Sequence, residues 1–139
     1  MSIILGIDYG VKRTGLAVTD PLKIIASSLR TIETKFVLDY LFDFYSKNEI
    51  DMVVIGLPRQ KDNTDSLVEK KIKKFIYNLK KRIPDINIDR YDERYTSKIA
   101  MKTIIESGVR KKKRKDKGLI DAISATILLQ SYINYRLKL

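Results

Sequence analysis

The chain has 139 residues, with 28 Lys or Arg against 17 Asp or Glu, and its formal net charge is +11. It contains no His and no Cys, which excludes disulfides, thiol nucleophiles, histidine general bases and Cys-based zinc sites. The surplus of positive charge predicts a polyanionic partner, either nucleic acid or an anionic membrane surface. A bound metal ion is expected to be a hard cation on oxygen ligands, Mg²⁺ or Mn²⁺.

The length is typical of a single domain, and we assign residues 1–139 to one. The N-terminal residues lack the basic leader of a signal peptide. No apolar run approaches the ~20 residues that a membrane span needs. We therefore expect a soluble cytoplasmic protein without a membrane partner.

The first part of the chain predicts three strands. Residues 3–9 contain a short apolar run that ends at Asp8, and residues 10–15 form a turn bounded by glycines. Residues 16–19 follow closely enough for a hairpin, and residues 24–32 predict a third strand.

The middle of the chain alternates helices and strands. Residues 35–47 repeat apolar side chains with helical spacing, and a second helix begins near residue 66 and ends before Pro84. Residues 52–55 are continuously apolar, which is typical of a central parallel strand covered on both faces. Residues 86–91 alternate weakly and predict the fifth strand.

The C-terminal part predicts two helices, over residues 96–107 and 118–136, with a basic loop over residues 110–117 between them. Gly108 marks the end of the first of these helices. All these elements together predict an α/β protein with a mixed five-stranded sheet.

Asp8 is the first candidate for a functional residue. It lies at the carboxyl end of the first predicted strand, where ligand sites of open α/β sheets gather. Gly10 allows the chain to turn tightly there, and Arg13 and Gly15 follow in the same turn. An ordinary turn would account for an Asp at this position equally well.

Asp92, Glu93 and Arg94 follow the fifth predicted strand. Alone they would be interpreted as a solvated charge cluster. Because the first and fifth strands end at the same edge of the predicted sheet, either Asp92 or Glu93 is placed to approach Asp8.

Asp121 lies in the first turns of the last predicted helix. Its neighbours four and seven residues on are Ala125 and Leu128, so it falls on an apolar stripe. An acid near a helix N-terminus also opposes the helix dipole. A carboxylate on a buried stripe is unfavourable unless a cation neutralises it, which favours a metal ligand.

Three converging carboxylates without His suit a phosphodiester nuclease with two metal ions. Such ions lie roughly 3.5–4 Å apart and stabilise the attacking and the leaving oxygen. The candidates are Asp8, Asp121 and one of the two acids at positions 92 and 93.

Residues 110–117 carry the densest charge in the chain and adjoin the helix of Asp121. We expect this run to follow a phosphate backbone, although such runs are often only solvated loops. Its proposed nucleic-acid contacts are Arg110, Lys111, Lys112, Lys113, Arg114 and Lys117. Lysines 70, 71, 73 and 74 are interpreted instead as the polar side of an amphipathic helix.

Four motifs in this order resemble the YqgF family, also called RuvX-like: proposed Holliday-junction resolvases or proposed pre-16S rRNA nucleases. The opening motif Asp-x-Gly-x-x-Arg-x-Gly-x-Ala begins at Asp8, and Gly-Leu-Pro occupies residues 56–58. Asp-Glu-Arg with a following hydroxyl residue occupies residues 92–96. A Lys before an Asp on an Ala-rich helix is met by Lys117 and Asp121.

The resemblance implies a ribonuclease H-like fold, with helices on both faces of the sheet and Asp8, Glu93 and Asp121 as the acidic metal site. It also implies a role in maturing the 5′ end of precursor 16S rRNA. Arg13, Arg94 and Lys117 are then candidate phosphate contacts. The cofactor expected is Mg²⁺ or Mn²⁺, and the partner is precursor rRNA or branched DNA.

Three other hypotheses about the function remain open. A Holliday-junction resolvase would act on DNA and would need a homodimer to cut symmetric strands. A ribosome-assembly or transcription factor of the same fold would bind nucleic acid without cleaving it. Asp8, Gly10 and Gly15 also resemble the phosphate loop of actin-like ATPases, although those proteins need two such domains.

Overall fold

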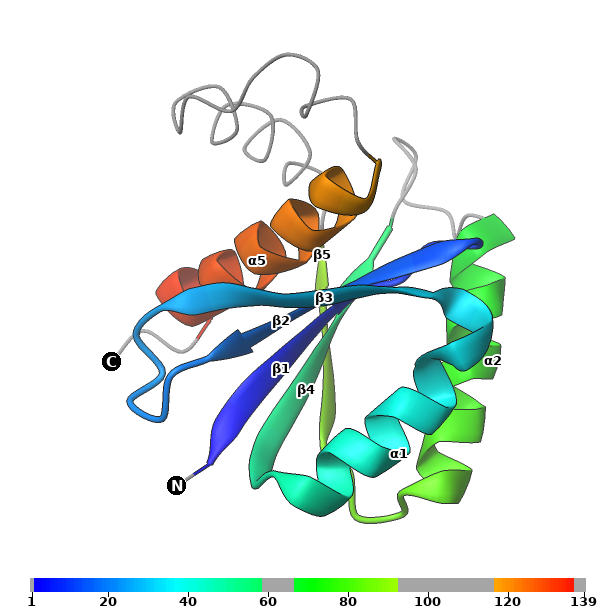
Figure 1. The fold of residues 1–139 in the computed structure, drawn as a ribbon, viewed down its shortest axis with the longest axis horizontal. Coiled ribbons are helices and arrows are strands. Elements are labelled where there is room, and N and C mark those ends of the chain that lie inside the picture. The colour runs from blue at the N-terminus through cyan, green and yellow to red at the C-terminus, as the bar shows by residue number, and fades with distance from the viewer. Residues whose placement is uncertain (1, 59–66, 93–116, 137–139) are drawn as a thin grey trace.

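The computed structural model describes residues 2–58, 67–92 and 117–136, and for residues 117–122 it describes the backbone alone (Figure 1). No helix in these parts of the chain is both long and apolar enough to cross a membrane.

One mixed sheet organises the molecule, with the strands in the order β3-β2-β1-β4-β5. β1 runs antiparallel to β2, and β2 antiparallel to β3, whereas β4 is parallel to both β1 and β5. The predicted five-stranded mixed sheet is therefore confirmed. The strand bounds are β1 Ile3–Asp8, β2 Arg13–Thr19, β3 Ala26–Glu33, β4 Ile50–Leu57 and β5 Ile88–Asp92.

Helices cover both faces of this sheet, as predicted (Figure 1). A 3₁₀ turn, η1 (Thr34–Phe36), leads into α1 (Val37–Lys47), which lies with α2 (Leu67–Arg82) on one face. α5 (Lys117–Tyr135) covers the other face. Strands β1 and β4 are apolar on both sides because each contributes to both cores.

Two cores follow from the alternation of side chains along the strands. The core under α1 and α2 contains Leu5, Ile7, Leu16, Val53 and Ile55 from the sheet, packed with Val37, Leu41, Ile72, Phe75 and Leu79. The core under α5 contains Ile4, Ala17 and Val54, packed with Ala125, Leu129, Tyr132 and Ile133.

α5 lies very close to β1 because position 6 has no side chain. A Cβ atom added to Gly6 would lie 2.9 Å from Cβ of Leu129, which is closer than such atoms normally approach. Glycine in a strand interior often marks such a close approach.

Some element boundaries differ from the predictions. β2 begins at Arg13 rather than at residue 16, because Arg13 and Thr14 already pair with Glu33 and Ile32 of β3. β3 begins at Ala26, since the N–H groups of Ile24 and Ile25 each donate to Oδ1 of Asp20 at 2.8 Å. Such side-chain bonds compete with the strand ladder.

The C-terminal predictions are only partly testable. α5 begins at Lys117, so this residue is helical and not part of the predicted basic loop. The predicted helix over residues 96–107 and the rest of the basic loop lie outside the described residues.

Candidate functional site

Asp8 is the last residue of β1 and lies at the edge of the sheet where β1, β4 and β5 all end. Ile7 pairs with Ile55 of β4, so Asp8 lies level with the following residue, Gly56. Gly56 in turn pairs with Tyr91 of β5. The predicted meeting of the first and fifth strand ends at one edge is therefore confirmed.

Alternation along β1 places Asp8 on the face covered by α5. Ile4 packs in the core under α5, and Gly6 lies against Leu129 of that helix. Asp8 is the next residue of the same parity. Its side chain is half-buried and is engaged in interactions with its surroundings.

α5 runs antiparallel to β1, and this brings its N-terminal turns towards Asp8. Ile133 lies beside Ile4 at the far end of the strand, and Leu129 lies against Gly6. Four helical residues advance about 6 Å, which is close to the roughly 6.6 Å spanned by two strand residues. Ala125 is therefore level with Asp8, and the backbone of Asp121 lies about one turn further on.

The apolar stripe predicted for this helix is confirmed at Ala125 and Leu128, which are 0% and 1% exposed. The side chain of Asp121 lies outside the described part of the structure. Its placement as a metal ligand therefore stays a prediction that rests on the position of its backbone.

Asp92 is the last residue of β5, and the face of its side chain follows from the strand residues before it. Asp89 accepts a hydrogen bond from Tyr132 of α5 at 2.8 Å, whereas Arg90 binds Glu69 of α2. Asp92 has the parity of Arg90, so the alternation assigns it to the α2 face, opposite to Asp8. This argues against Asp92 as the partner of Asp8.

Several predicted site residues lie outside the described residues: Glu93, Arg94, Arg110, Lys111, Lys112, Lys113 and Arg114. Lys117 is described only in its backbone. Within the described ranges no group of three or more acidic side chains is arranged to hold a metal ion. The convergence of three carboxylates stays a prediction.

The tight turn that Gly10 predicted after Asp8 is confirmed. A Cβ atom at position 10 would lie 2.1 Å from the carbonyl oxygen of Arg13, so no other residue fits there without a shift of the backbone. Thr34 Oγ1 donates to the Gly10 carbonyl at 2.5 Å and lies 2.8 Å from Thr14 Oγ1. The Thr34 N–H also donates to the Lys12 carbonyl at 2.9 Å.

Thr14 and Thr34 were not identified from the sequence. Thr14 is completely buried, and its hydroxyl is paired with that of Thr34. A buried hydroxyl needs such a partner. Because the two threonines are 20 residues apart, no sequence motif joins them, and only the pairing of β2 with β3 reveals the contact.

Arg90 and Glu69 form a second arrangement that the sequence did not reveal. Arg90 donates from Nη1 to Glu69 Oε2 at 2.8 Å and from Nη2 to Glu69 Oε1 at 2.6 Å. The same guanidinium donates to the carbonyls of Ile55 at 3.2 Å and Gly56 at 2.8 Å. It therefore ties the end of β4, beside Asp8, to α2.

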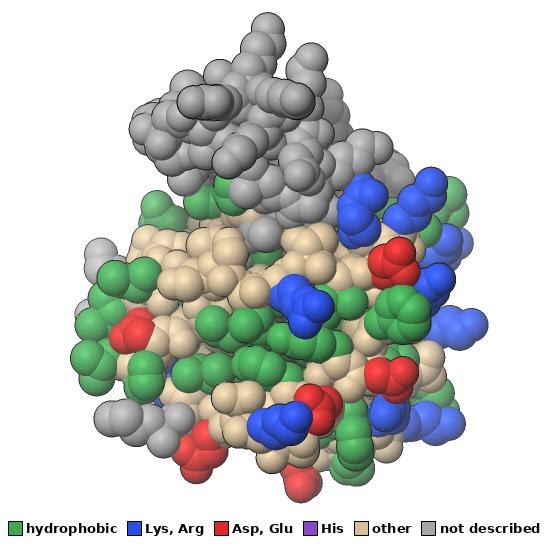
Figure 2. All heavy atoms as spheres, in the orientation of Figure 1, with side chains coloured by type: hydrophobic (Ala, Val, Ile, Leu, Met, Phe, Trp, Pro, Cys, Tyr) green, Lys and Arg blue, Asp and Glu red, His purple; other side chains and the backbone are tan. Residues whose placement is uncertain are grey.

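Positive side chains gather along the side of the molecule on which α2 lies, as Figure 2 shows. α2 alone contains six lysines and one arginine. Arg13, a predicted phosphate contact, lines a hollow with Val11, Lys12 and Lys35 near the start of β2. The side of the molecule near Asp8 is thus strongly cationic.

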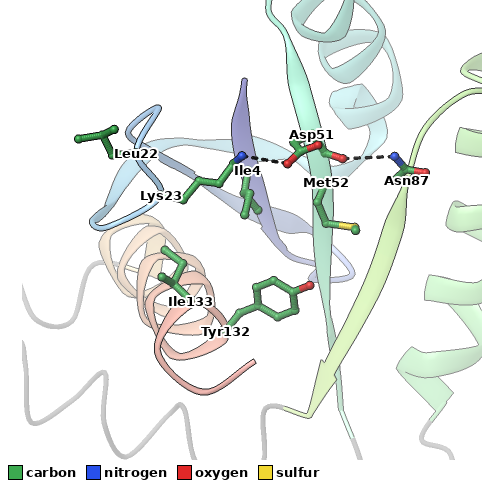
Figure 3. Close-up of a pocket in the computed structure, with 8 residues that line it drawn as sticks. All are labelled: Ile4, Leu22, Lys23, Asp51, Met52, Asn87, Tyr132 and Ile133. Carbon is green, nitrogen blue, oxygen red and sulfur yellow. Dashed lines mark hydrogen bonds and ion pairs between the residues drawn. The ribbon is translucent and has the colours of Figure 1, made fainter. Parts of the chain in front are cut away.

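A cavity of about 430 Å³ opens at the other end of the strands, away from Asp8 (Figure 3). Ile4, Met52 and Tyr132 line it, and Lys23 and Asp51 pair at 2.9 Å across its rim. These sheet residues lie at the amino ends of β1 and β4. The cavity is therefore separate from the site around Asp8.

Comparison with known proteins relates the chain to resolvases and nucleases. A family model named RuvX and described as Holliday junction resolvase matches residues 2–135. A relative from Christiangramia forsetii is 45% identical over 133 residues, covering 96% of this chain and 98% of the relative. A relative from Porphyromonas gingivalis is 48% identical over 134 residues, covering 96% and 97%. Both are named as proposed pre-16S rRNA nucleases.

Two solved structures share the fold. The Holliday junction resolvase of fowlpox virus, bound to its junction DNA, has a TM-score of 0.60 at 17% identity and covers 98% of this chain and 99% of its own. Thermus thermophilus RuvC, also bound to a Holliday junction, has a TM-score of 0.56 at 15% identity and covers 96% of each chain. The ribonuclease H-like fold predicted from the motifs is confirmed by this likeness.

Proposed function

Since the chain belongs to the RuvX family of Holliday junction resolvases, we propose that it is a metal-dependent nuclease that matures the 5′ end of precursor 16S rRNA. The match of the whole region 2–135 to that family, with relatives at 45–48% identity named for this RNA, is the observation that carries the proposal. The net charge of +11 suits a protein that binds a polyanion.

The placement of Asp8 supports the chemistry. Its carboxylate lies at the carboxyl edge of the sheet, on the α5 face, about one helical turn from the level of Asp121. The chain offers no His or Cys, so that its metal donors are oxygens, and oxygen donors fit Mg²⁺ or Mn²⁺. The residues present therefore fit a hard divalent cation.

Asp8, Glu93 and Asp121 would hold the metal ions. We prefer Glu93 to Asp92 because strand alternation assigns Asp92 to the opposite face. Bound divalent cations supply charge stabilisation for hydrolysis of a phosphodiester. Arg13, Arg94 and Lys117 would hold the phosphates on either side of the cleaved bond, and the basic residues 110–114 would extend this contact.

A second candidate substrate is a four-way DNA junction. It is favoured by the description of the matching family and by the junction DNA in both similar structures. Symmetric cleavage of a junction requires a two-fold dimer, whereas trimming of one RNA end does not. The oligomeric state in solution therefore helps to separate the two substrates.

The experiment compares two substrates under the same conditions: an RNA that carries the 16S 5′ end with its precursor extension, and a four-way DNA junction. Each is incubated with purified protein and Mg²⁺ or Mn²⁺. We expect cleavage of the RNA that stops on addition of a chelator. Cleavage of the junction alone would instead support a resolvase.

The Asp8→Asn variant provides the control for a protein that binds without cutting. We expect it to lose cleavage and to retain binding of the RNA. If the wild-type protein binds both substrates tightly but cleaves neither with any divalent cation, the nuclease proposal is wrong and a binding factor of the same fold is correct.

A further inference from the structure

A basic groove runs from the residue after Asp8 onto the outer side of α2. Its volume is about 440 Å³, and its lining includes Tyr9, Lys35, Lys71, Lys74, Phe75 and Asn78. We call these residues the α2 groove. They come from the end of β1, from η1 and from α2, so that only the folded chain brings them together.

The α2 groove begins beside the end of β1 that carries Asp8, on the other face of the sheet. Tyr9 follows Asp8 directly, and the two side chains lie on opposite faces because of the strand alternation. A second hollow of about 410 Å³ shares Val11 and Lys35 with the groove and also contains Arg13. A strand held at Arg13 therefore has a direct path into the α2 groove.

The charge of this path is strongly positive. Five of the side chains that line the two hollows are Lys or Arg, and the only acid among these lining residues is Glu33. Glu33 lies 3.7 Å from Lys35, and both side chains are more than 60% exposed, so that this ion pair is weak. Lys71 and Lys74 are exposed and make no ion pair with any residue in the described ranges.

The two lysines also have the right spacing for a row of phosphates. They are three residues apart on one helix and therefore project from the same side of α2. The polar side of an ordinary amphipathic helix would carry acids as well as lysines. Between Lys70 and Arg82, α2 contains none.

Aromatic and amide groups lie among these cations. The ring of Tyr9 packs on Phe75 with a centroid distance of 5.3 Å and an interplanar angle of 48°, which holds it at the wall of the groove. Asn78 adds an amide that can donate to and accept from a base edge. Cations with an aromatic platform are typical of sites for single-stranded nucleic acid, because an unpaired base exposes a face on which an aromatic ring stacks.

We propose that the α2 groove binds a single-stranded flank of the RNA substrate next to the cleaved bond, with Lys71 and Lys74 on phosphates and Tyr9 against a base. This inference rests on the proposed nuclease function for its choice of RNA. It gives the α2 lysines a role beyond the polar helix side predicted from their sequence.

The test measures binding rather than cleavage, in an Asp8→Asn background. The probes are an unstructured single-stranded RNA and a blunt RNA duplex of equal length, and fluorescence anisotropy is recorded over a range of salt concentrations. The test variant is Lys71→Gln/Lys74→Gln. The matched control is Lys80→Gln/Lys81→Gln, which removes the same charge from exposed positions of the same helix outside the groove.

We expect the test variant to bind the single strand about tenfold more weakly. Each lost phosphate contact changes the slope of log affinity against log salt by about 0.7 for a single strand, so its slope should become shallower by about 1.4. The single-strand affinity of the control should stay within about twofold of the parent, because salt screens charges that lie outside the groove. Binding of the blunt duplex should change little in either variant.

Tyr9 provides an independent readout. Tyr9→Leu should weaken single-strand binding by about tenfold, while Tyr9→Phe keeps the ring and should bind as the parent does. Circular dichroism and thermal melting establish that each variant is folded. Should Tyr9→Leu fail to fold, the lysine pair still decides the question.

Three results would overturn the inference: equal losses in the test and control variants, no loss in the test variant, or the same loss on the duplex as on the single strand. The proposed nuclease function fails separately. If the wild type does not cleave but the lysine variant still loses single-strand binding, the groove stands and the nuclease assignment falls. If the wild type cleaves and the lysine variant binds and cleaves normally, the nuclease assignment stands and the groove proposal is wrong.

Discussion

Arg90 joins the end of β4 to α2 through a paired contact with Glu69, at 2.8 Å and 2.6 Å between the two guanidinium nitrogens and the two carboxylate oxygens. Glu69 is 1% exposed, and Arg90 is an ion-pair partner of its buried carboxylate. The same arginine binds the carbonyl of Gly56, which is level with Asp8. This contact therefore fixes the end of β4 beside Asp8.

Removal of one partner of this pair should strongly destabilise the protein. We expect Arg90→Met to lower the free energy of unfolding by roughly 3 kcal/mol, because a buried carboxylate loses the guanidinium that pairs with it. Arg90→Met/Glu69→Leu should recover much of the loss. Urea unfolding measures both, with Asp43→Asn as a control that breaks the exposed pair to Lys47 and should cost less than about 1 kcal/mol. A double variant less stable than Arg90→Met would contradict this account.

The contact of Gly6 with Leu129 sets how closely α5 approaches β1. Gly6→Ala should destabilise the protein by about 1–3 kcal/mol, because its Cβ would meet Leu129 at 2.9 Å. Leu129→Ala creates a cavity of its own and should cost about 2–5 kcal/mol. The double variant should be destabilised by less than the sum of the two single costs, since the new methyl enters the space that Leu129 leaves. Strictly additive costs would show that the close approach does not limit the packing.

Alkaline pH should weaken the attachment of α5 to β5. Burial, together with the hydrogen bond and the charge of Asp89, raises the pKa of Tyr132 from 10.0 to about 12. The folded protein therefore loses roughly 2–3 kcal/mol of stability as the pH rises from about 10 towards about 12, and this loss is absent below that range.

The variant Tyr132→Phe tests this contribution. Near pH 8 it should be less stable than the wild type by about 1 kcal/mol, because one hydrogen bond is lost. Between pH 10 and pH 12 this difference should shrink and then reverse. Tyr135→Phe, at an exposed position of the same helix, should follow the wild type throughout. A Tyr132→Phe curve that stays parallel to that of the wild type would disprove the linkage.

The assignment of the acids predicts a clear order of effects on cleavage. Asp8→Asn and Glu93→Gln should each lower kcat by more than about a hundredfold. The loss of a residue that only supports a metal ligand already costs up to about a hundredfold, and a direct ligand should cost more. Asp92→Asn should lower it far less, because alternation assigns Asp92 to the α2 face. Single-turnover cleavage of the precursor RNA distinguishes these cases. A larger loss for Asp92→Asn than for Glu93→Gln would reverse the assignment.

Metal binding should be visible in the stability of the protein. Mg²⁺ or Mn²⁺ at a hundred times its Kd should raise the free energy of unfolding by about 2.7 kcal/mol, since the unfolded chain lacks the site. Asp121→Asn should abolish most of this gain. Without metal the same variant should be at least as stable as the wild type, because it relieves repulsion among the carboxylates. Full metal stabilisation in Asp121→Asn would remove Asp121 from the site.

The strands that carry the site could be predicted from the amino-acid sequence. β1 and β4 were predictable because both are short apolar runs bounded by polar or turn residues, and the hydrophobic effect leaves such runs no other place than the centre of a covered sheet. Asp8 at the end of the first run, and Ala125 and Leu128 on the buried stripe of α5, followed from the same local patterns.

The face that each residue takes depends on how the strands and helices pack in three dimensions. The face of Asp92 depends on the register of β5 against β4, and a shift of one residue would exchange every side chain between the two faces. The pairing of Arg90 with Glu69, 21 residues away, and the meeting of Tyr9 and Lys35 with Lys71 and Lys74 leave no periodic trace in the chain. These contacts join separate elements, and their distances are set by how the elements pack and not by the residues between them.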